Sequence, residues 1–406
     1  MQLPLKRKGG RKLSCSLPPG IPPSVSGDDT PEHLENRAVF ARIIPHFHAM
    51  EHIVLTGLLP EEIAALLPPG REQYRGMQIF RWIHERGALG FDEMTNLPKA
   101  FRAEIAGRFG IGVLNPLEIR VSSDGSTDKY LWECADGSRI ESVIIRDRGP
   151  RVCEHTGGKS DRTTACISSQ VGCRMACRFC RTGGMRFTRN LTPGEIIDQL
   201  IRMRRRLSDS GEDITNIVFM GMGEPLDNLD AVLKTASIIN METALSISQR
   251  KVTVSTCGIV PGILRLAREY RRIGLAISLN APDDDLRSRL MPINRRYPLA
   301  ELLDAAREFT ALARRRITFE YILIRGVNDS PEHARKLLGI ARSIPSKVNL
   351  IALNEYEGSP FRRPDDETID TFQRILFDGN VTAFIRKSKG TDILAACGQL
   401  ASLTRG

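Results

Sequence analysis

Residues 172–180 read GCRMACRFC, and this stretch decides the fold because it brings three cysteines together at C-x3-C-x2-C spacing. The three are Cys173, Cys177 and Cys180. A 4Fe-4S cluster normally takes four cysteine ligands, so a compact set of three holds three irons and leaves the fourth open to a small molecule. The motif therefore predicts a reactive iron-sulfur site.

A zinc site is the alternative interpretation of the triplet. Zinc would need a fourth Cys or His at zinc-finger spacing. His155 lies 18 residues upstream of Cys173, and Cys166 lies seven residues upstream in a stretch with strand character. Neither residue extends the triplet, so the spacing favours the cluster over zinc and over three inert thiols.

The composition is that of a globular protein with an excess of positive charge. Hydrophobic residues make up 41% of the 406 residues and charged residues 26%, which are ordinary values. Lys and Arg number 58 against 48 Asp and Glu, which leaves a net charge of +10. This excess favours polyanionic partners, because basic side chains neutralise phosphates. The length leads us to expect two domains.

Cellular location is inferred from the apolar segments and the cysteines. No stretch approaches the roughly 18 apolar residues of a membrane span, and no apolar segment follows the basic N-terminus. The nine cysteines are odd in number and gather around one motif, which is typical of metal or catalytic thiols in a reducing compartment. We therefore expect a cytoplasmic protein with no membrane association.

The N-terminal part of the sequence begins with a tail and continues into helices. Residues 1–35 are rich in Pro, Gly, Ser and basic side chains, which predicts a disordered basic tail. Apolar periodicity then predicts helices over 61–67, 77–87 and 100–110. Gly87 and Gly110 stand where these helices are expected to end.

A change of periodicity marks a set of strands after the helices. Residues 117–146 alternate in strand fashion around Asp124-Gly125 and Asp136-Gly137, dipeptides that favour primed hairpin turns. We expect a small antiparallel sheet here. Together with the preceding helices it would form an N-terminal α+β accessory domain over residues 53–146.

From residue 160 to residue 406 apolar strands alternate with amphipathic helices. This pattern predicts a parallel sheet that curls into a partial (β/α)6 barrel, with chemistry at the carboxyl ends of the strands. The expected strands are 163–169, 216–221, 251–257, 275–281, 317–324, 347–353 and 381–387. The cysteine triplet, Glu224, Ser255, Asn280 and Asn354 fall at or just after strand ends.

Six blocks of sequence resemble, in order, those of the dual-specificity adenine-C2 RNA methyltransferases, the RlmN family of radical S-adenosylmethionine (SAM) enzymes. The resemblance runs from about residue 53 to the end of the chain. The blocks are SSQVGCRMACRFCRTGGMRFTRNLTPGEII, NIVFMGMGEPLDN, VTVSTCGIVP, LAISLNAPDDDLRSRLMPINRRY, FEYILIRGVND and FIRKSKGTDILAACGQL.

The resemblance implies a role for each candidate residue. The 4Fe-4S cluster would be held by Cys173, Cys177 and Cys180, and SAM would be contacted by Gly223, Glu224, Ser255, Ser278, Leu279, Asn280 and Asn354. Cys397 would be methylated on sulfur, Cys166 would resolve a covalent adduct, and Glu141 would accept a proton. Asn280 stands where many relatives have His, although an amide can still hydrogen-bond a ribose or carboxylate.

The activity that the resemblance implies is methylation of carbon 2 of adenosine. The substrates would be large-subunit rRNA, at the peptidyl-transferase centre, and tRNA, 3' of the anticodon. Carbon 2 is electrophilic and has no acidic proton, so a radical is required. One SAM would methylate Cys397, and a second would yield a deoxyadenosyl radical that takes hydrogen from this methyl group. Release of the RNA would leave a Cys166–Cys397 disulfide.

The same resemblance implies several partners. An electron donor of the flavodoxin or ferredoxin type would reduce the cluster, and a thiol reductant would open the disulfide. The expected protein is a monomer. The accessory region would recognise RNA shape and backbone through a group of arginines, or would only pack on the barrel as a lid. The arginines are Arg71, Arg75, Arg81, Arg86, Arg102 and Arg108.

Two other functions fit the sequence less closely. The nearest is methylation of carbon 8 of the same rRNA adenosine with the same cysteines, as in the antibiotic-resistance relatives. The other, from a different class, is a non-catalytic RNA-binding protein with an iron-sulfur or zinc site.

Overall fold

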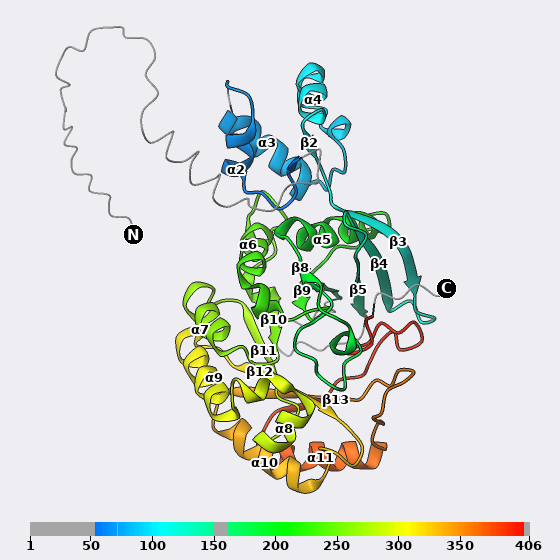
Figure 1. Cartoon of the computed structure of the whole chain (residues 1–406), viewed down its shortest axis with the longest axis vertical. Helices are drawn as coiled ribbons and strands as arrows, with labels where there is room; N and C mark the ends of the chain where they lie inside the picture. The colour runs from blue at the N-terminus through cyan, green and yellow to red at the C-terminus, as the bar shows by residue number, and fades with distance from the viewer. Residues whose placement is uncertain (1–52, 71, 149–160, 402–406) are drawn as a thin grey trace, which may run out of the picture. The chain divides into compact units, whose positions relative to one another are not determined.

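The structure is a computed structural model that describes residues 53–70, 72–148 and 161–401. The predicted basic tail, residues 1–35, lies outside these described residues. At the centre of the structure is one mixed sheet, in the order β14-β13-β12-β11-β10-β9-β6-β5-β4-β3 (Figure 1).

The strands from β6 to β14 run parallel to one another and form the partial barrel. They are β6 (Arg162–Cys166), β9 (Asn216–Phe219), β10 (Val252–Thr256), β11 (Gly274–Ser278), β12 (Ile317–Leu323), β13 (Ser346–Ala352) and β14 (Ala383–Ile385). Each inferred strand of this region is present, which confirms the expected α/β architecture.

The antiparallel strands near the N-terminus continue the barrel sheet. They are β3 (Leu114–Val121), β4 (Thr127–Cys134) and β5 (Arg139–Asp147). Strand β5 pairs antiparallel with β6, with Val143 opposite Cys166. The three strands are antiparallel, as expected, but the pairing of β5 with β6 makes them part of the barrel sheet and not a small sheet of their own.

The two hairpin connections differ in type from the predicted primed turns. The amides of Gly125 and Gly137 donate to the carbonyls of Ser122 and Cys134, three residues back. Both glycines have positive φ, of 65° and 77°. A glycine in this place closes a type I turn as a G1 bulge, whereas a primed two-residue turn would need positive φ one residue earlier as well. The Asp-Gly dipeptides therefore predicted the positions of the two turns correctly, but the predicted turn type was wrong.

Helices cover the outer face of the sheet, and side-chain caps fix several of their starts. At the start of α5, Thr192 Oγ1 accepts a hydrogen bond from the Glu195 amide and the Glu195 carboxylate accepts one from the Thr192 amide. Asp283, Ser330 and Asp365 cap α8, α10 and α11. The helices are α5 (Pro193–Ser208), α6 (Leu229–Asn240), α7 (Val260–Glu269), α8 (Asp284–Leu290), α9 (Leu299–Ala313), α10 (Pro331–Arg342) and α11 (Asp366–Asp378).

The N-terminal helices are α2 (Pro60–Leu66), α3 (Glu72–His84) and α4 (Lys99–Ala106), followed by β2 (Phe109–Gly110), which pairs with β1 (Ile53–Val54). Gly87 lies just past α3 with a φ of 71°, as expected. Gly110 is part of β2, so the third helix ends earlier than predicted. Two short strands, β7 (Gln170–Val171) and β8 (Arg189–Asn190), pair antiparallel with each other.

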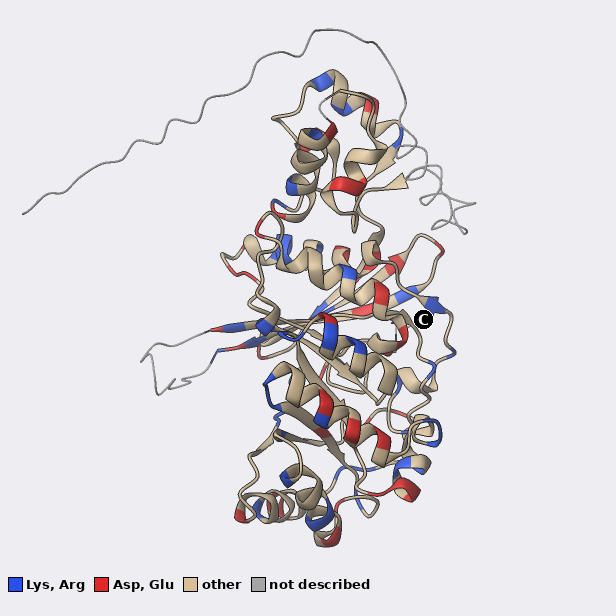
Figure 2. Ribbon diagram, turned by 90° about the vertical axis from the view of Figure 1, so that its left-hand side faces the viewer, with Lys and Arg blue, Asp and Glu red and all other residues tan. Residues whose placement is uncertain are grey.

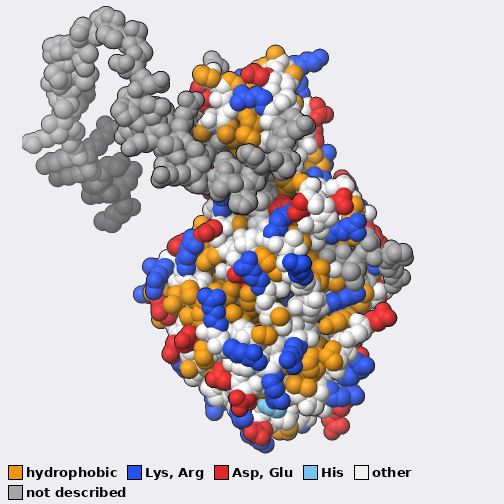
Figure 3. Space-filling view, in the orientation of Figure 1, with side chains coloured by type: hydrophobic (Ala, Val, Ile, Leu, Met, Phe, Trp, Pro, Cys, Tyr) orange, Lys and Arg blue, Asp and Glu red, His pale blue; other side chains and the backbone are white. Residues whose placement is uncertain are grey.

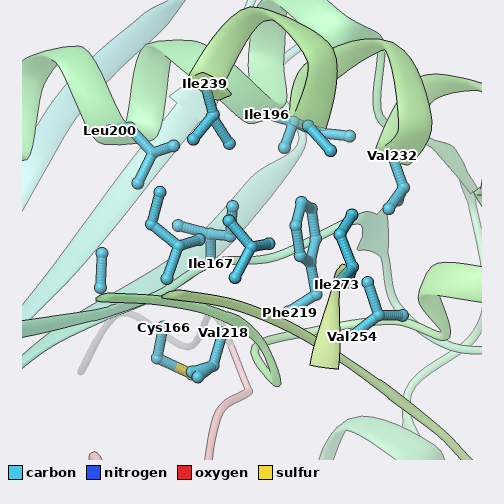
Figure 4. Close-up of a cluster of buried hydrophobic side chains, with 14 of the residues drawn as sticks. Cys166, Ile167, Ile196, Leu200, Val218, Phe219, Val232, Ile239, Val254 and Ile273 are labelled. Carbon is cyan, nitrogen blue, oxygen red and sulfur yellow. The ribbon is translucent and has the colours of Figure 1, made fainter. Parts of the chain in front are cut away.

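A continuous hydrophobic core fills the space between the sheet and its helices. Figure 4 shows Ile167, Phe219 and Leu200 on the helix side of the sheet, while Cys166 and Val218 point to the opposite side. We call this opposite side the inner face. Within the described ranges no helix has the length and apolar character that crossing a membrane would require.

Candidate active site

The three cysteines of the triplet lie on one loop between β7 and β8. The amide of Cys180 donates to the Cys177 carbonyl at 3.1 Å, and the amide of Gly184 donates to the Cys180 carbonyl at 3.2 Å. Ala176 has a φ of 51°, in the left-handed region that is uncommon for a residue with a side chain. A Cβ atom on Gly183 would lie 2.6 Å from the Cys177 carbonyl oxygen. The loop is therefore tightly wound around the thiols.

The chemistry of this thiol group fits an iron-sulfur cluster. The thiols pack against an apolar group that includes Phe179, Met175 and Leu290. Burial raises the pKa of Cys173 to about 12 and raises the pKa values of Cys177 and Cys180, and charge on the neighbouring thiols raises them further. Three thiolates held together in an apolar site need positive charge for compensation, which iron supplies.

The spacing of the ligands also bears on the zinc alternative. Among the described residues, no three His, Cys, Asp or Glu side chains converge closely enough to hold a single metal ion. One ion would draw its thiolate ligands to about 2.3 Å from a common centre. A cluster instead assigns each cysteine to a different iron.

Gly223 and Glu224 follow β9 and lie beside the triplet loop. Gly223 has a φ of 98°, and a Cβ atom there would lie 2.5 Å from Cβ of Gln170. The buried Glu224 carboxylate accepts hydrogen bonds from the amides of Leu226, at 3.1 Å, and Cys257, at 2.8 Å. Burial raises the pKa of Glu224, although these bonds oppose the shift. The carboxylate thus joins the loops that follow β9 and β10.

Four more predicted SAM contacts lie on β10 and on or just after β11, and they differ in accessibility. Ser255 and Ser278 are half-buried, whereas Leu279 and Asn280 are buried. Asn280 has a φ of 56°, and its side-chain oxygen accepts a hydrogen bond from the Ile322 amide at 2.9 Å. The Asn280 side chain therefore ties β11 to β12, and the serines are the more open of these positions.

Cys397 lies near both the triplet and Cys166. Charge on Cys397 contributes to the raised pKa of Cys180 and, after burial, is the second cause that raises the pKa of Cys166 to about 12. Both Cys166 and Cys397 are free thiols. The structure thus brings Cys397, from near the C-terminus, to the cluster loop and Cys166, which lie more than 200 residues earlier in the chain.

Two more predicted residues contact the segment that carries Cys397. The side-chain amide of Asn354, just after β13, donates to the Cys397 carbonyl at 3.0 Å. One carboxylate oxygen of Glu141, on β5, accepts a hydrogen bond from the Ala401 amide at 3.0 Å. In this structure both side chains hold the C-terminal segment.

Two site residues, Arg287 and Lys129, escaped the sequence analysis. Arg287 is fully buried on α8, and its guanidinium donates to the carbonyls of Cys257, at 2.6 Å, and Leu279, at 3.2 Å. Lys129 forms an ion pair with Glu141 at 3.2 Å. Arg386 follows β14, and nearby Cys397 raises its pKa. Arg287 lies within one of the six blocks quoted above, so the family resemblance could have pointed to it. Lys129 lies outside all six blocks.

The accessory-region arginines stack on aromatic rings or pair with neighbours. The guanidinium groups of Arg75, Arg86 and Arg108 lie 5.3, 4.3 and 5.2 Å from the ring centres of Phe101, Trp82 and Phe109. Arg81 pairs with Glu85 and Arg102 donates to the Asp92 carbonyl. Arg71 lies outside the described residues. Figures 2 and 3 show that Lys and Arg side chains are dispersed over many elements of the protein.

Comparison with known proteins identifies the family. Residues 167–338 match the Radical SAM superfamily, and residues 55–111 match the ribosomal RNA large subunit methyltransferase N-terminal domain. The dual-specificity RNA methyltransferase RlmN of Pelobacter propionicus is 49% identical over 82% of this chain and 90% of its own length. The RlmN of Geobacter sulfurreducens is 48% identical over 86% of this chain and 92% of its own length.

The chain belongs to the RlmN family. A solved radical SAM methyltransferase from Sphaerobacter thermophilus superimposes with a TM-score of 0.80 and 43% identity, over 86% of this chain and all of that one. The partial barrel is accordingly a radical SAM barrel with an N-terminal accessory region. Membership of this superfamily implies a 4Fe-4S cluster and SAM.

Proposed function

We propose that this radical SAM enzyme methylates carbon 2 of adenosine in large-subunit rRNA and in tRNA, through an S-methylated Cys397. The observation that carries the proposal is the placement of the Cys397 segment against the triplet loop, where the Arg181 amide donates to the Gly398 carbonyl at 2.8 Å, and charge on Cys397 also raises the pKa of Cys166. A methyl carrier needs to reach the cofactor site, and an adduct formed on it needs a second thiol nearby.

The residues proposed to bind the cofactors are the ones that the sequence analysis assigned from the family resemblance. Cys173, Cys177 and Cys180 would hold the cluster, while Gly223, Glu224, Ser255, Ser278, Leu279, Asn280 and Asn354 would surround SAM. For Leu279 and Asn280 the backbone is the part available, because their side chains are buried. When bound, the cluster and SAM supply a deoxyadenosyl radical. Two SAM would be used for each methyl group delivered.

The protein residues would then act in sequence. The Cys397 thiolate accepts a methyl group from one SAM by displacement and, after loss of a hydrogen atom, its methylene radical adds to carbon 2 of the base. The carbon 2 proton passes to Glu141, and the cluster, when bound, would accept the one electron that the adduct gives up. The Cys166 thiolate attacks the Cys397 sulfur, and the carbon–sulfur electron pair stays on the methylene carbon, which takes a proton and becomes the methyl group.

The remaining parts of the proposal concern partners. The disulfide left between Cys166 and Cys397 would be opened by a thiol reductant, and a flavodoxin- or ferredoxin-like protein would supply electrons. The accessory region 53–146 would contact RNA, and the protein would act as a monomer in the cytoplasm. The target base would be unstacked to reach the thiols, as other enzymes that act on a base atom require.

Nucleoside mass spectrometry of rRNA and tRNA, from cells with and without this chain, tests the proposal. We expect 2-methyladenosine in both RNA fractions only when the chain is present. Appearance of 8-methyladenosine would assign the carbon-8 activity instead. No difference in any methyladenosine would leave the non-catalytic alternative.

A further inference from the structure

The C-terminal segment, residues 389–401, lies against the inner face of the sheet and the triplet loop. On the loop side, the amide of Arg181 donates to the Gly398 carbonyl at 2.8 Å and the Thr182 hydroxyl donates to the Leu400 carbonyl at 2.6 Å. On the sheet side, the Ser123 amide donates to the Asp392 carboxylate at 2.9 Å. The segment is therefore held from two directions, with Cys397 between them.

Strand register explains why β4 and β5 supply polar partners for this segment. Residues opposite each other in a sheet share a face, so Lys129, opposite Val143, lies on the same face as Cys166, which is also opposite Val143. Glu141 lies two residues from Val143 and shares this face as well. Lys129 and Glu141 are therefore diagonal cross-strand neighbours, within reach of each other.

Lys129 and Glu141 form an ion pair whose two members contact the chain on either side of Cys397 in the sequence. Lys129 Nζ lies 3.2 Å from Glu141 Oε1, and the exposed fractions of the two side chains are only 9% and 4%. The same ammonium donates to the Leu394 carbonyl at 3.3 Å. The second oxygen of Glu141 accepts from the Ala401 amide. The pair thus fixes the chain three residues before and four residues after Cys397.

We infer that Lys129 is a positioning residue, and that with Glu141 it forms a latch that holds the Cys397 segment against the sheet. Hydrogen bonds to charged groups are stronger than those between neutral groups, and a buried charge that loses its partner is strongly destabilised. The latch is therefore stable while both charges are present and weakens sharply when either is removed.

The functional consequence rests on the proposed function. Glu141 would accept the proton from the RNA adduct, and a protonated Glu141 carries no charge to pair with Lys129. Proton arrival would weaken the contacts to Lys129 and to the Ala401 amide at the same moment. The segment would then be released at the step at which the Cys397 sulfur must reach Cys166.

Hydrogen exchange of the full-length, anaerobically reconstituted protein tests the latch, with the variant Lys129→Met. We expect exchange of the amides from Leu394 to Ala401 to become at least about tenfold faster, since this substitution removes a charged group that holds the segment. Amides of β4 and β5 should keep their wild-type rates. The matched control is Lys336→Met, on α10, which removes an exposed lysine paired with Glu332 and Asp283 and should change neither region.

A second variant separates the latch from a general loss of structure. Glu141→Gln keeps an oxygen acceptor for the Ala401 amide but removes the charge, as protonation would. We expect the same faster exchange confined to the segment. Unchanged exchange in both variants, or equal loosening of β4, β5 and the segment, would overturn the latch.

Product analysis of the same samples keeps the latch and the proposed function distinguishable. With the latch broken, SAM cleavage to deoxyadenosine should continue in Lys129→Met while the yield of methylated RNA falls at least about tenfold. Wild-type yield despite faster exchange would show that the latch has no part in the reaction. Absence of S-methylated Cys397 in the wild-type protein would instead refute the proposed function, while the exchange data would still decide the latch.

Discussion

Single residues already separate the proposed roles of the two site cysteines, Cys166 and Cys397. The Cys166→Ala variant should accumulate protein covalently bound to RNA through Cys397, because the thiol that releases the adduct is missing. A denaturing gel of labelled RNA would detect the adduct. The control is Cys134→Ala, which removes another buried thiol on β4 and should give no adduct. Free methylated RNA at normal yield from Cys166→Ala would contradict the assignment.

Gly223 offers a second test, because only glycine fits its backbone and surroundings. An alanine there would adopt an unfavourable φ near 98°, at a cost of about 1–3 kcal/mol, and its Cβ would lie 2.5 Å from Gln170. We expect at least about tenfold weaker SAM binding by calorimetry, with iron content unchanged.

Gly339→Ala is the matched control for that substitution. Gly339 lies within α10, and an added Cβ would meet no heavy atom within 4 Å. Helix propensity then predicts unchanged SAM binding and a gain in stability of up to about 1 kcal/mol. Wild-type SAM affinity in Gly223→Ala would show that the loop after β9 tolerates a side chain and moves away from Gln170.

Among the elements, α3 carries a group that makes the accessory region sensitive to acid. His84 is buried, with Nδ1 3.0 Å from the Phe80 carbonyl and Nε2 3.4 Å from the Gly57 amide. Burial lowers the pKa of His84 from 6.5 to about 4. The unfolded chain therefore binds a proton more readily, and stability present above pH 6.5 is lost as pH falls toward 4, by at most about 3 kcal/mol.

Urea unfolding followed by tryptophan fluorescence at pH 7.5, 6 and 5 would measure this loss. The variant His84→Gln cannot charge, so its stability should fall less between pH 7.5 and pH 5 than that of the wild type. Comparing the two proteins at each pH removes the contribution of other acid-sensitive groups. Parallel pH profiles would show that His84 is not the group responsible.

The elements also show what sequence reasoning reached and where it stopped. Alternation of apolar strands and helices identified the strands of the barrel, because each strand has its own local pattern. The pairing of β5 with β6 has no such pattern, since residues 148–161 separate the two strands in the sequence. Without that pairing the register is unknown, and the placement of Glu141 on the same face as Cys166 could be expected only from the family resemblance.

The same reason explains why Lys129 was missed. A lysine in a strand is usually solvated on an outer face, and nothing in its neighbourhood of sequence indicates burial. Its partner Glu141 lies on the next strand, and its other contact, the Leu394 carbonyl, lies 265 positions along the chain. Such a contact is decided by the tertiary fold alone, whereas the triplet cysteines are adjacent in sequence and needed no fold to be recognised.

For the whole molecule, the excess of positive charge predicts that RNA binding depends on salt. Each Lys or Arg that neutralises a phosphate releases counterions, so affinity falls as salt rises. Arg86 and Arg108 are exposed and lie over aromatic rings, which leaves their charge accessible. If the accessory region contacts RNA, the variants Arg86→Gln and Arg108→Gln should each weaken binding and reduce the slope of log affinity against log salt by about one.

Fluorescence anisotropy with a labelled rRNA fragment, from 50 to 300 mM salt, would give these slopes. The control is Arg307→Gln on α9, an arginine with an exposed fraction of 47% that pairs with Asp304. It lowers the net charge by the same one unit, so a general effect of net charge would appear in all three variants equally. A smaller slope only in the accessory-region variants would locate phosphate contacts there, whereas three equal slopes would favour a region that merely packs on the barrel.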